Sequence, residues 1–360
     1  MKKYITVIIL GVSVCAHSCL SETRIASLQN GLVKVDFDLQ TGYYQLFDKQ
    51  RGVLCIDSAY AQINGWKTTD PLTRTHRITK EAGGQSLLIE CADAENKTLL
   101  LQFSLQPGKP YLILAAGVDN RSNDTLIIKK IMPLAEGRIF KGKNVRENLR
   151  ILDGNGGGES TVMRHKPPVA CRNNMLLCFG NEIESHSLVM GGITYSEYNK
   201  SVRVDSISSA VLSVGLYAED FVGKRLDPNT AYLPEGDRFF LDCVTGDPFA
   251  SLENYGKVLS EMQNAHPNYY YFPSICLWYA QYPIYGGVNT LATNDSPGAV
   301  EEMERVNRSG WLKYTTMAIR LVPDCYDENN ENGWWDDEHW QMHDNGGMHE
   351  GMKLKGNHYR

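Results

Sequence analysis

The stretch VKVDFDLQTGYYQ, from Val33 to Gln45, decides the fold class of this chain. Every second residue from Val33 to Leu39 is apolar, and charged residues stand between them. The pair Thr41-Gly42 separates this run from a second one that begins at Tyr43. Alternation with period two is typical of a β-strand with one buried face, and a Thr-Gly pair is typical of a turn. The stretch therefore predicts a strand, a turn and a second strand.

The same pattern continues from about Leu28 to Asp242. Short apolar runs are separated by glycine, proline, asparagine and aspartate, and no helical periodicity lies between them. The runs are LLLQFSL, YLILAAGV, TLIIKKIMPL, SLVMGGITY, SVRVDSI and AVLSVGLYA. Many short strands in succession predict antiparallel sheets packed face to face. Within one run, Gly191-Gly192 indicates a bulge or a close approach of another group to the backbone.

The periodicity changes near residue 247. Asp247 followed by Pro248 is typical of a helix N-terminus, and this helix is expected to end near His266-Pro267. A second helix is expected to open at Ser296-Pro297 and to close at Gly310. Apolar strands precede and follow it, with the sequences SICLWYAQ and TTMAIRLV. Strand, helix and strand in this order predict the first β/α unit of a barrel, in which functional residues follow the carboxyl ends of the strands.

The composition excludes several classes of protein. The chain has 360 residues, of which 42% are hydrophobic and 22% charged, which is ordinary for a globular protein of about two domains. Its formal net charge of −6 argues against binding to nucleic acid, which requires a concentrated basic surface. Beyond the first residues, no apolar run approaches the roughly 20 residues that span a bilayer.

The first residues have the pattern of a secretory leader. Lys2 and Lys3 precede the apolar run from Tyr4 to Val14, and small or polar residues follow. Cleavage after Ala16-x-Ser18 fits an ordinary signal peptidase, whereas Cys19 resembles the cysteine of a bacterial lipoprotein box. Residues 1–19 are therefore expected to direct export, to the periplasm or as an outer-membrane lipoprotein of a bacterium. A lipid at Cys19 is the only membrane attachment expected.

No metal or cofactor is expected. Beyond the leader the cysteines stand singly, without the C-x-x-C pairs of a zinc ribbon or the regular spacing of a disulfide framework. His339 and His343 are four residues apart and could share a helix face, with Asp336 or His349 as a further ligand. Trp340, however, occupies the position of the glutamate in an H-E-x-x-H site.

The stretch ENGWWDDEHW, Glu331 to Trp340, carries the strongest local candidate for a binding site. It places Trp334 and Trp335 directly beside Asp336 and Asp337. Neighbouring side chains diverge on a strand or a helix, so these aspartates are poor candidates for the carboxyl pair that faces one scissile bond in a retaining glycosidase. Aromatic faces beside carboxylates suit the C–H face and the hydroxyls of a sugar. The alternative is a helix start, with the acidic residues at its N-terminus and the tryptophans in the core.

Layout and motifs together resemble the α-galactosidases of glycoside hydrolase family 36 and their clan-D relatives. The resemblance lies in RLVPDCYDENNENGWWDDEHW, Arg320 to Trp340, and in GGITYSEY, Gly191 to Tyr198. It implies a mainly β chain, with an N-terminal antiparallel β-supersandwich, a linker helix and the first β/α units of an incomplete (β/α)8 barrel. The implied boundaries are residues 22–246, 247–266 and 270–360.

The resemblance also implies an activity and a site. Asp324-Cys325-Tyr326 matches half of the family's sugar-binding pattern, because Pro323 replaces the first aspartate. Asp336 and Asp337 could make the missing contacts, and Trp278 or its neighbour Tyr279 could line the pocket unless they pack in the core. The full-length protein would cleave α-galactosides or related oligosaccharides or polysaccharides with retention. The catalytic aspartates are expected beyond Arg360, so the 360 residues alone are expected to be inactive. The alternative is a non-enzymatic glycan-binding or surface-assembly protein.

Overall fold

The computed structural model describes residues 24–81, 83–153, 162–163, 167–265, 273–276 and 304–320. The chain divides into two compact units, Met1–Ala265 and His266–Arg360. Each unit is described by itself below, and the larger part of the described residues belongs to the first.

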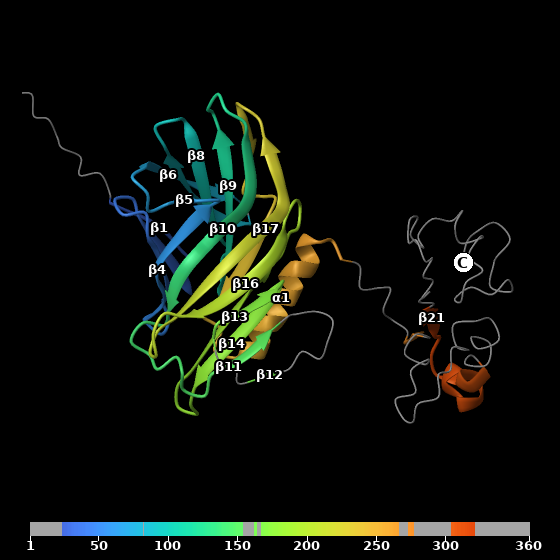
Figure 1. The fold of residues 1–360 in the computed structure, drawn as a ribbon. Helices are drawn as coiled ribbons and strands as arrows, with labels where there is room; N and C mark the ends of the chain where they lie inside the picture. The colour runs from blue at the N-terminus through green and yellow to red at the C-terminus, as the bar shows by residue number, and fades with distance from the viewer. Residues whose placement is uncertain are drawn as a thin grey trace, which may run out of the picture. The chain divides into compact units, whose positions relative to one another are not determined.

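Among the described residues, sheet A of the first unit contains nine strands, and all the pairings between them are antiparallel. Its strands follow the order β1-β2-β3-β4-β10-β17-β16-β13, with β5 paired to β4 (Figure 1). Their bounds are β1 (Ile25–Gln29), β2 (Val33–Asp38), β3 (Tyr44–Asp48), β4 (Val53–Ile63), β5 (Trp66–Lys67), β10 (Leu126–Ile139), β13 (Val169–Arg172), β16 (Asn199–Ser206) and β17 (Leu212–Leu226).

Sheet B contains ten strands in the described part of the chain, and it is antiparallel as well. Its order is β12-β11-β14-β15-β19-β9-β8-β7-β6, with β18 paired to β9. The bounds are β6 (Thr73–Glu81), β7 (Gly84–Ala92), β8 (Lys97–Leu105), β9 (Tyr111–Asn120), β11 (Arg150–Asp153), β12 (Val162–Met163), β14 (Asn174–Gly180), β15 (Ser185–Gly192), β18 (Thr230–Tyr232) and β19 (Arg238–Asp242).

The hairpin of β2 and β3 forms as the alternation in the sequence predicts. Apolar residues of β2 are buried and the charged residues between them are half-buried. The strands pair from Val33 opposite Asp48 to Phe37 opposite Tyr44, so β3 begins one residue later than predicted. Gly42 adopts a φ of 77° in the turn, and a Cβ there would lie 1.9 Å from the Thr68 carbonyl oxygen. Glycine is therefore required both by the backbone conformation and by the neighbouring chain.

The core lies between the two sheets. Tyr44 of sheet A packs edge to face on Phe103 of sheet B, with ring centroids 5.0 Å apart. The buried Tyr44 hydroxyl donates to the Pro133 carbonyl at 2.8 Å, so its polar atom is satisfied inside the core. The predicted class, mainly β with antiparallel sheets packed face to face, is confirmed.

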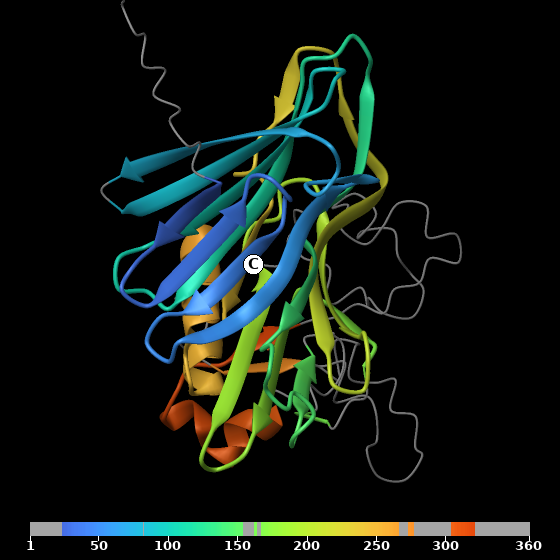
Figure 2. The same ribbon diagram turned by 90° about the vertical axis from the view of Figure 1, so that its left-hand side faces the viewer.

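Helix α1 (Pro248–Met262) covers the other face of sheet B, along β14 and β15 (Figures 1 and 2). Asp247 caps its N-terminus, because the carboxylate accepts from the Phe249 N–H at 2.9 Å, and Pro248 occupies the first turn as predicted. Tyr255 and Val258 are buried in a second apolar cluster with Phe240 of β19. Sheet B is therefore buried on both faces here, which explains why β15 reads as a continuous apolar run.

Gly191 and Gly192 leave space for two different neighbours. A Cβ at Gly191 would lie 2.7 Å from the Tyr255 ring, and one at Gly192 would lie 2.4 Å from Lys200 Cγ. The Tyr255 hydroxyl donates to the Gly192 carbonyl at 2.8 Å. The close approach predicted from the glycine pair is confirmed, with the helix on one face and a core side chain on the other.

In the second unit, β20 (Ser274–Cys276) and β21 (Ala318–Arg320) pair in parallel. Residues 304–309 between them are helical, and Gly310 ends this helix with a φ of 82°. A short 3-10 turn, η3 (Trp311–Lys313), follows directly. The order of strand, helix and parallel strand matches the predicted start of a β/α unit. Within the described segments, no helix is long and apolar enough to cross a membrane.

Candidate functional site

The site residues predicted from the sequence lie outside the described residues. They are Trp278, Asp324, Trp334, Trp335, Asp336 and Asp337, and the same holds for the lipidation candidate Cys19. Their roles stay predictions, and the site built below comes from the first unit.

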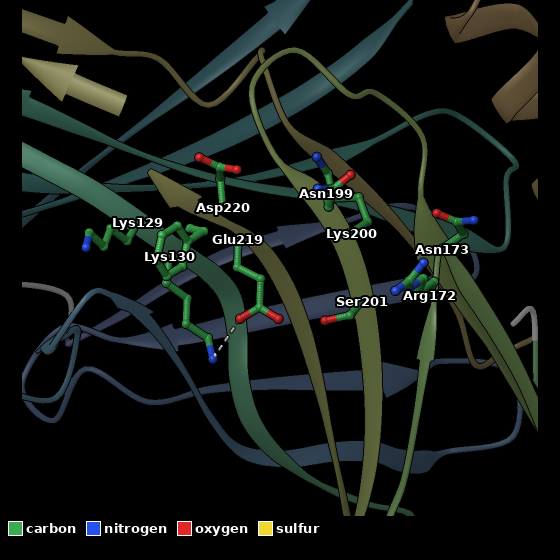
Figure 3. Close-up of a pocket in the computed structure, with 10 residues that line it drawn as sticks. Lys129, Lys130, Arg172, Asn173, Asn199, Lys200, Ser201, Glu219 and Asp220 are labelled. Atoms are coloured by element: carbon green, nitrogen blue, oxygen red, sulfur yellow. Dashed lines mark ion pairs between the residues drawn. The ribbon is translucent and has the colours of Figure 1, made fainter. Parts of the chain in front are cut away.

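A pocket of about 710 Å³ opens on sheet A, where β10, β13, β16 and β17 run side by side (Figure 3). Residues of both charges, two amides, a serine and one aromatic residue line it. They are Lys129, Lys130, Arg172, Asn173, Asn199, Lys200, Ser201, Glu219, Asp220 and Phe221, and of these the Lys200 side chain is itself 0% exposed. The pocket could not be predicted from the sequence, because its residues come from four separate segments of the chain.

Strand register brings these residues together. Glu219 of β17 lies opposite Lys130 of β10 on one side and opposite Asn199 of β16 on the other. Ser201 of β16 lies opposite Arg172 of β13. Because pairing partners project from the same face of a sheet, Lys130, Glu219 and Asn199 form one cross-strand row, and Ser201 and Arg172 lie in the next row on that face.

An irregularity in β17 forms one wall of the pocket. Residues 220–223 oppose only Lys129, because Lys130 pairs with Glu219 and Ile128 pairs with Lys224. The Asp220 carboxylate accepts from the Val222 and Gly223 N–H groups at 3.0 and 2.8 Å and so holds this excursion. Phe221 at its tip is 92% exposed. Such an exposure is unusual for phenylalanine, which normally buries its ring.

Two of the four cationic residues that line the pocket have carboxylate partners, Lys130 in Glu219 and Lys200 in Asp237. Lys130 Nζ lies 3.2 Å from a Glu219 oxygen and 4.5 Å from the centre of the Tyr217 ring (Figure 3 shows the ion pair). Lys129 Nζ lies 5.9 Å from the centre of the Phe221 ring. A carboxylate and two aromatic ring faces therefore interact with the positive charges of these lysines.

Neutral hydrogen-bonding groups complete the lining. Asn173 is exposed, and its backbone adopts the left-handed conformation with a φ of 68°. Its N–H donates to the Lys200 carbonyl, and its carbonyl accepts from the Gly192 N–H. The Asn199 amide is also exposed. The Ser201 hydroxyl is buried and, within the described part of the chain, has no hydrogen-bond partner. An amide offers two donors and an acceptor, so the pocket presents both kinds of hydrogen-bonding group.

A buried ion pair lies beneath the pocket. Lys200 Nζ contacts the Asp237 carboxylate and donates to the Tyr198 carbonyl at 3.1 Å, while the Tyr232 hydroxyl donates to the other Asp237 oxygen. Both charged side chains are 0% exposed. Burial lowers the pKa of Lys200 despite its partner, and burial together with Asp237 raises the pKa of Tyr232. This cluster joins the two sheets and is not accessible to a ligand. In the part of the chain that is described, no group of three or more His, Cys, Asp or Glu side chains could hold a metal ion.

No protein-family model and no curated protein sequence matches the chain. Solved structures match its fold. The α-galactosidase from Lactobacillus brevis superposes with a TM-score of 0.51 at 11% identity, over 82% of this chain and 48% of that protein. The family 36 α-galactosidase of Geobacillus stearothermophilus with raffinose gives 0.48 at 12% identity, over 82% and 49%. The α-N-acetylgalactosaminidase of Bifidobacterium bifidum gives 0.48 at 10%, over 84% and 53%.

The likeness is one of fold. The chain spans about half the length of these solved structures. At 11% identity the superposition on the Lactobacillus brevis enzyme shows a shared architecture of the glycoside-hydrolase-related type and does not transfer any residue's role.

Proposed function

We propose that this chain belongs to an α-galactosidase-like glycosidase that cleaves α-galactosides or related glycans with retention. The observation that carries the proposal is the succession of antiparallel sandwich, capped helix α1 and parallel strands β20 and β21. The sandwich and helix share the fold of an α-galactosidase, and the motif from Arg320 to Trp340 resembles the same family. Two independent sources, fold and local sequence, therefore support one class.

The proposed sugar-binding residues follow β21 in the sequence, except Trp278, which follows β20. Asp324 would accept hydrogen bonds from hydroxyls of the terminal sugar, and Asp336 with Asp337 would extend that contact. Trp334, Trp335 and Trp278 would cover the apolar C–H face of the ring. Retention requires a nucleophile and an acid/base carboxyl group about 5 to 5.5 Å apart.

The leader adds a proposed location. Its charged, apolar and small-residue segments support export, and Cys19 supports a lipid anchor in a bacterial envelope. A polymeric glycan cannot cross the inner membrane freely, so an exported glycosidase would act where such a substrate is found.

The test uses the product of the complete reading frame. It is assayed on a panel of aryl α- and β-glycosides, with Asp324→Ala measured beside the wild type. We expect hydrolysis of an α-galactoside, and a fall in kcat/KM of roughly ten- to a hundredfold in the variant, as for the loss of one or two strong hydrogen bonds to a substrate hydroxyl. Hydrolysis of β-glycosides alone would remove the proposed substrate class. A reading frame that stops at Arg360 would favour the non-enzymatic glycan-binding function.

A further inference from the structure

We propose that the pocket on sheet A is a binding site for a neutral oligosaccharide. The inference comes from the lining of the pocket and holds whether or not the protein hydrolyses glycans. Its location on the sandwich separates it in sequence from Asp324 and the tryptophans near it.

The balance of charge argues for a neutral ligand. An anionic ligand needs cations that are not already neutralised. Of the four cationic residues that line the pocket, Lys130 is paired with Glu219 and Lys200 is buried against Asp237. Arg172 also has an interaction within the protein, and Lys129 lies beside the Phe221 ring. Asp220 and Glu219 would also repel an anion, and Lys129 would repel a cation. A neutral ligand avoids both costs, since it leaves the existing pairs in place.

The hydrogen-bonding groups argue for a polyol. The exposed Asn173 and Asn199 present amide donors and acceptors to the pocket, beside the Glu219 and Asp220 carboxylates. A sugar hydroxyl both donates and accepts, so it can bond to an amide and a carboxylate at the same time. A ligand with only donors or only acceptors would leave half of these groups unsatisfied.

Phe221 supplies the apolar contact that sugar recognition also needs. Its ring stands at the rim with 92% of its surface exposed, and the Asp220 turn fixes the backbone that carries it. The axial C–H groups of a hexose form a flat apolar face that packs on an aromatic ring. The volume of about 710 Å³ lies within the roughly 300 to 1,000 Å³ of ordinary small-molecule sites, which is room for a short oligosaccharide.

The binding test uses the whole 360-residue chain and isothermal titration calorimetry. The neutral probes are stachyose, maltohexaose and cellohexaose, and polygalacturonate is the anionic probe. We expect saturable binding of at least one neutral probe, with little change when the salt concentration is raised about tenfold, because no net charge is neutralised. Preferential, salt-sensitive binding of polygalacturonate would overturn the assignment, as would the absence of binding to all three neutral probes.

Two variants and two matched controls locate the site. Phe221→Ala removes the exposed ring, and Phe249→Ala removes a ring that is 64% exposed on α1. Asn173→Gly removes an amide while keeping the left-handed backbone, and Asn229→Gly does the same at an exposed residue with a φ of 59° away from the pocket. We expect each pocket variant to weaken binding about fivefold or more, and each control to bind like the wild type.

Equal affinity in the pocket variants and the wild type would overturn the proposal. Hydrolysis by the complete gene product is a separate readout, and Phe221→Ala should leave the hydrolysis of a small aryl glycoside unchanged. If Phe221→Ala loses glycan binding but retains hydrolysis, the pocket proposal is supported separately from the glycosidase proposal. If the protein hydrolyses glycosides but binds no neutral probe at the pocket, the pocket proposal fails while the glycosidase proposal stands.

Discussion

Replacing Lys200 by methionine should destabilise the first unit strongly. The ammonium group and the Asp237 carboxylate are both 0% exposed, and they join β16 of sheet A to the residue that precedes β19 of sheet B. Methionine keeps the length of the side chain but removes the charge, so Asp237 would be left buried with only the Tyr232 hydroxyl as a partner. Breaking one side of a buried pair costs about 3 to 5 kcal/mol. We expect a loss of this size in the free energy of unfolding.

The assay is urea denaturation near neutral pH, followed by tryptophan fluorescence and circular dichroism. A double-mutant cycle with Asp237→Asn measures the interaction energy between Lys200 and Asp237 separately from their interactions with other residues. If the pair interacts directly, the double variant should be more stable than the sum of the two single losses by about 2 to 3 kcal/mol. A cost below about 1 kcal/mol for Lys200→Met, or strict additivity in the cycle, would refute the reasoning, because a buried carboxylate would then tolerate the loss of its counter-ion.

Three further predictions concern stability. Gly191→Ala should lower the free energy of unfolding, measured by urea denaturation, by about 1 to 3 kcal/mol, because the new methyl group meets the buried Tyr255 ring. A loss near zero would mean that the ring can move aside. Asp247→Ala should lower the free energy of unfolding by about 1 kcal/mol through loss of the cap on α1, whereas Asp247→Ser should retain most of the wild-type stability. Equal losses in both variants would contradict a capping role. His186, whose ring stacks near Phe140, has a pKa lowered by burial and by the charge of Arg51, so the unfolded chain binds its proton more readily. The free energy of unfolding should therefore fall as the pH drops below about 6.5, by at most about 1.4 kcal/mol per pH unit. A His186→Phe variant should lack this pH-dependent loss. If the difference in stability between the wild type and the variant stayed constant from pH 7 to 5, the reasoning would be contradicted.

Local patterns in the sequence predicted the parts of the fold that depend on local interactions. The alternation from Val33 to Leu39 predicted which residues of β2 are buried, because successive side chains of a strand point to opposite faces. Asp247 and Pro248 predicted where α1 begins, since both act on the first turn of the helix. The glycine pair at residues 191 and 192 predicted a close contact without naming the groups that make it.

The pocket and the buried ion pair could not be predicted in the same way. In the sequence, Lys200 appears as one lysine in an alternating strand, at a position where an apolar residue would be expected. Its partner Asp237 lies 37 residues further along the chain and on the other sheet. Charge becomes acceptable at a core position only when a distant strand supplies the counter-ion.

The periodicity of the residues was enough to predict the fold class, with its antiparallel sandwich, its capped helix and the parallel strands after it. Which strands are neighbours became known from the folded chain. The order β10-β17-β16-β13 places Lys130, Glu219, Ser201 and Arg172 on one face of sheet A, although these residues span 90 positions of the chain. Periodicity reports which face of a strand is buried, whereas register between distant strands depends on the packing of the whole core.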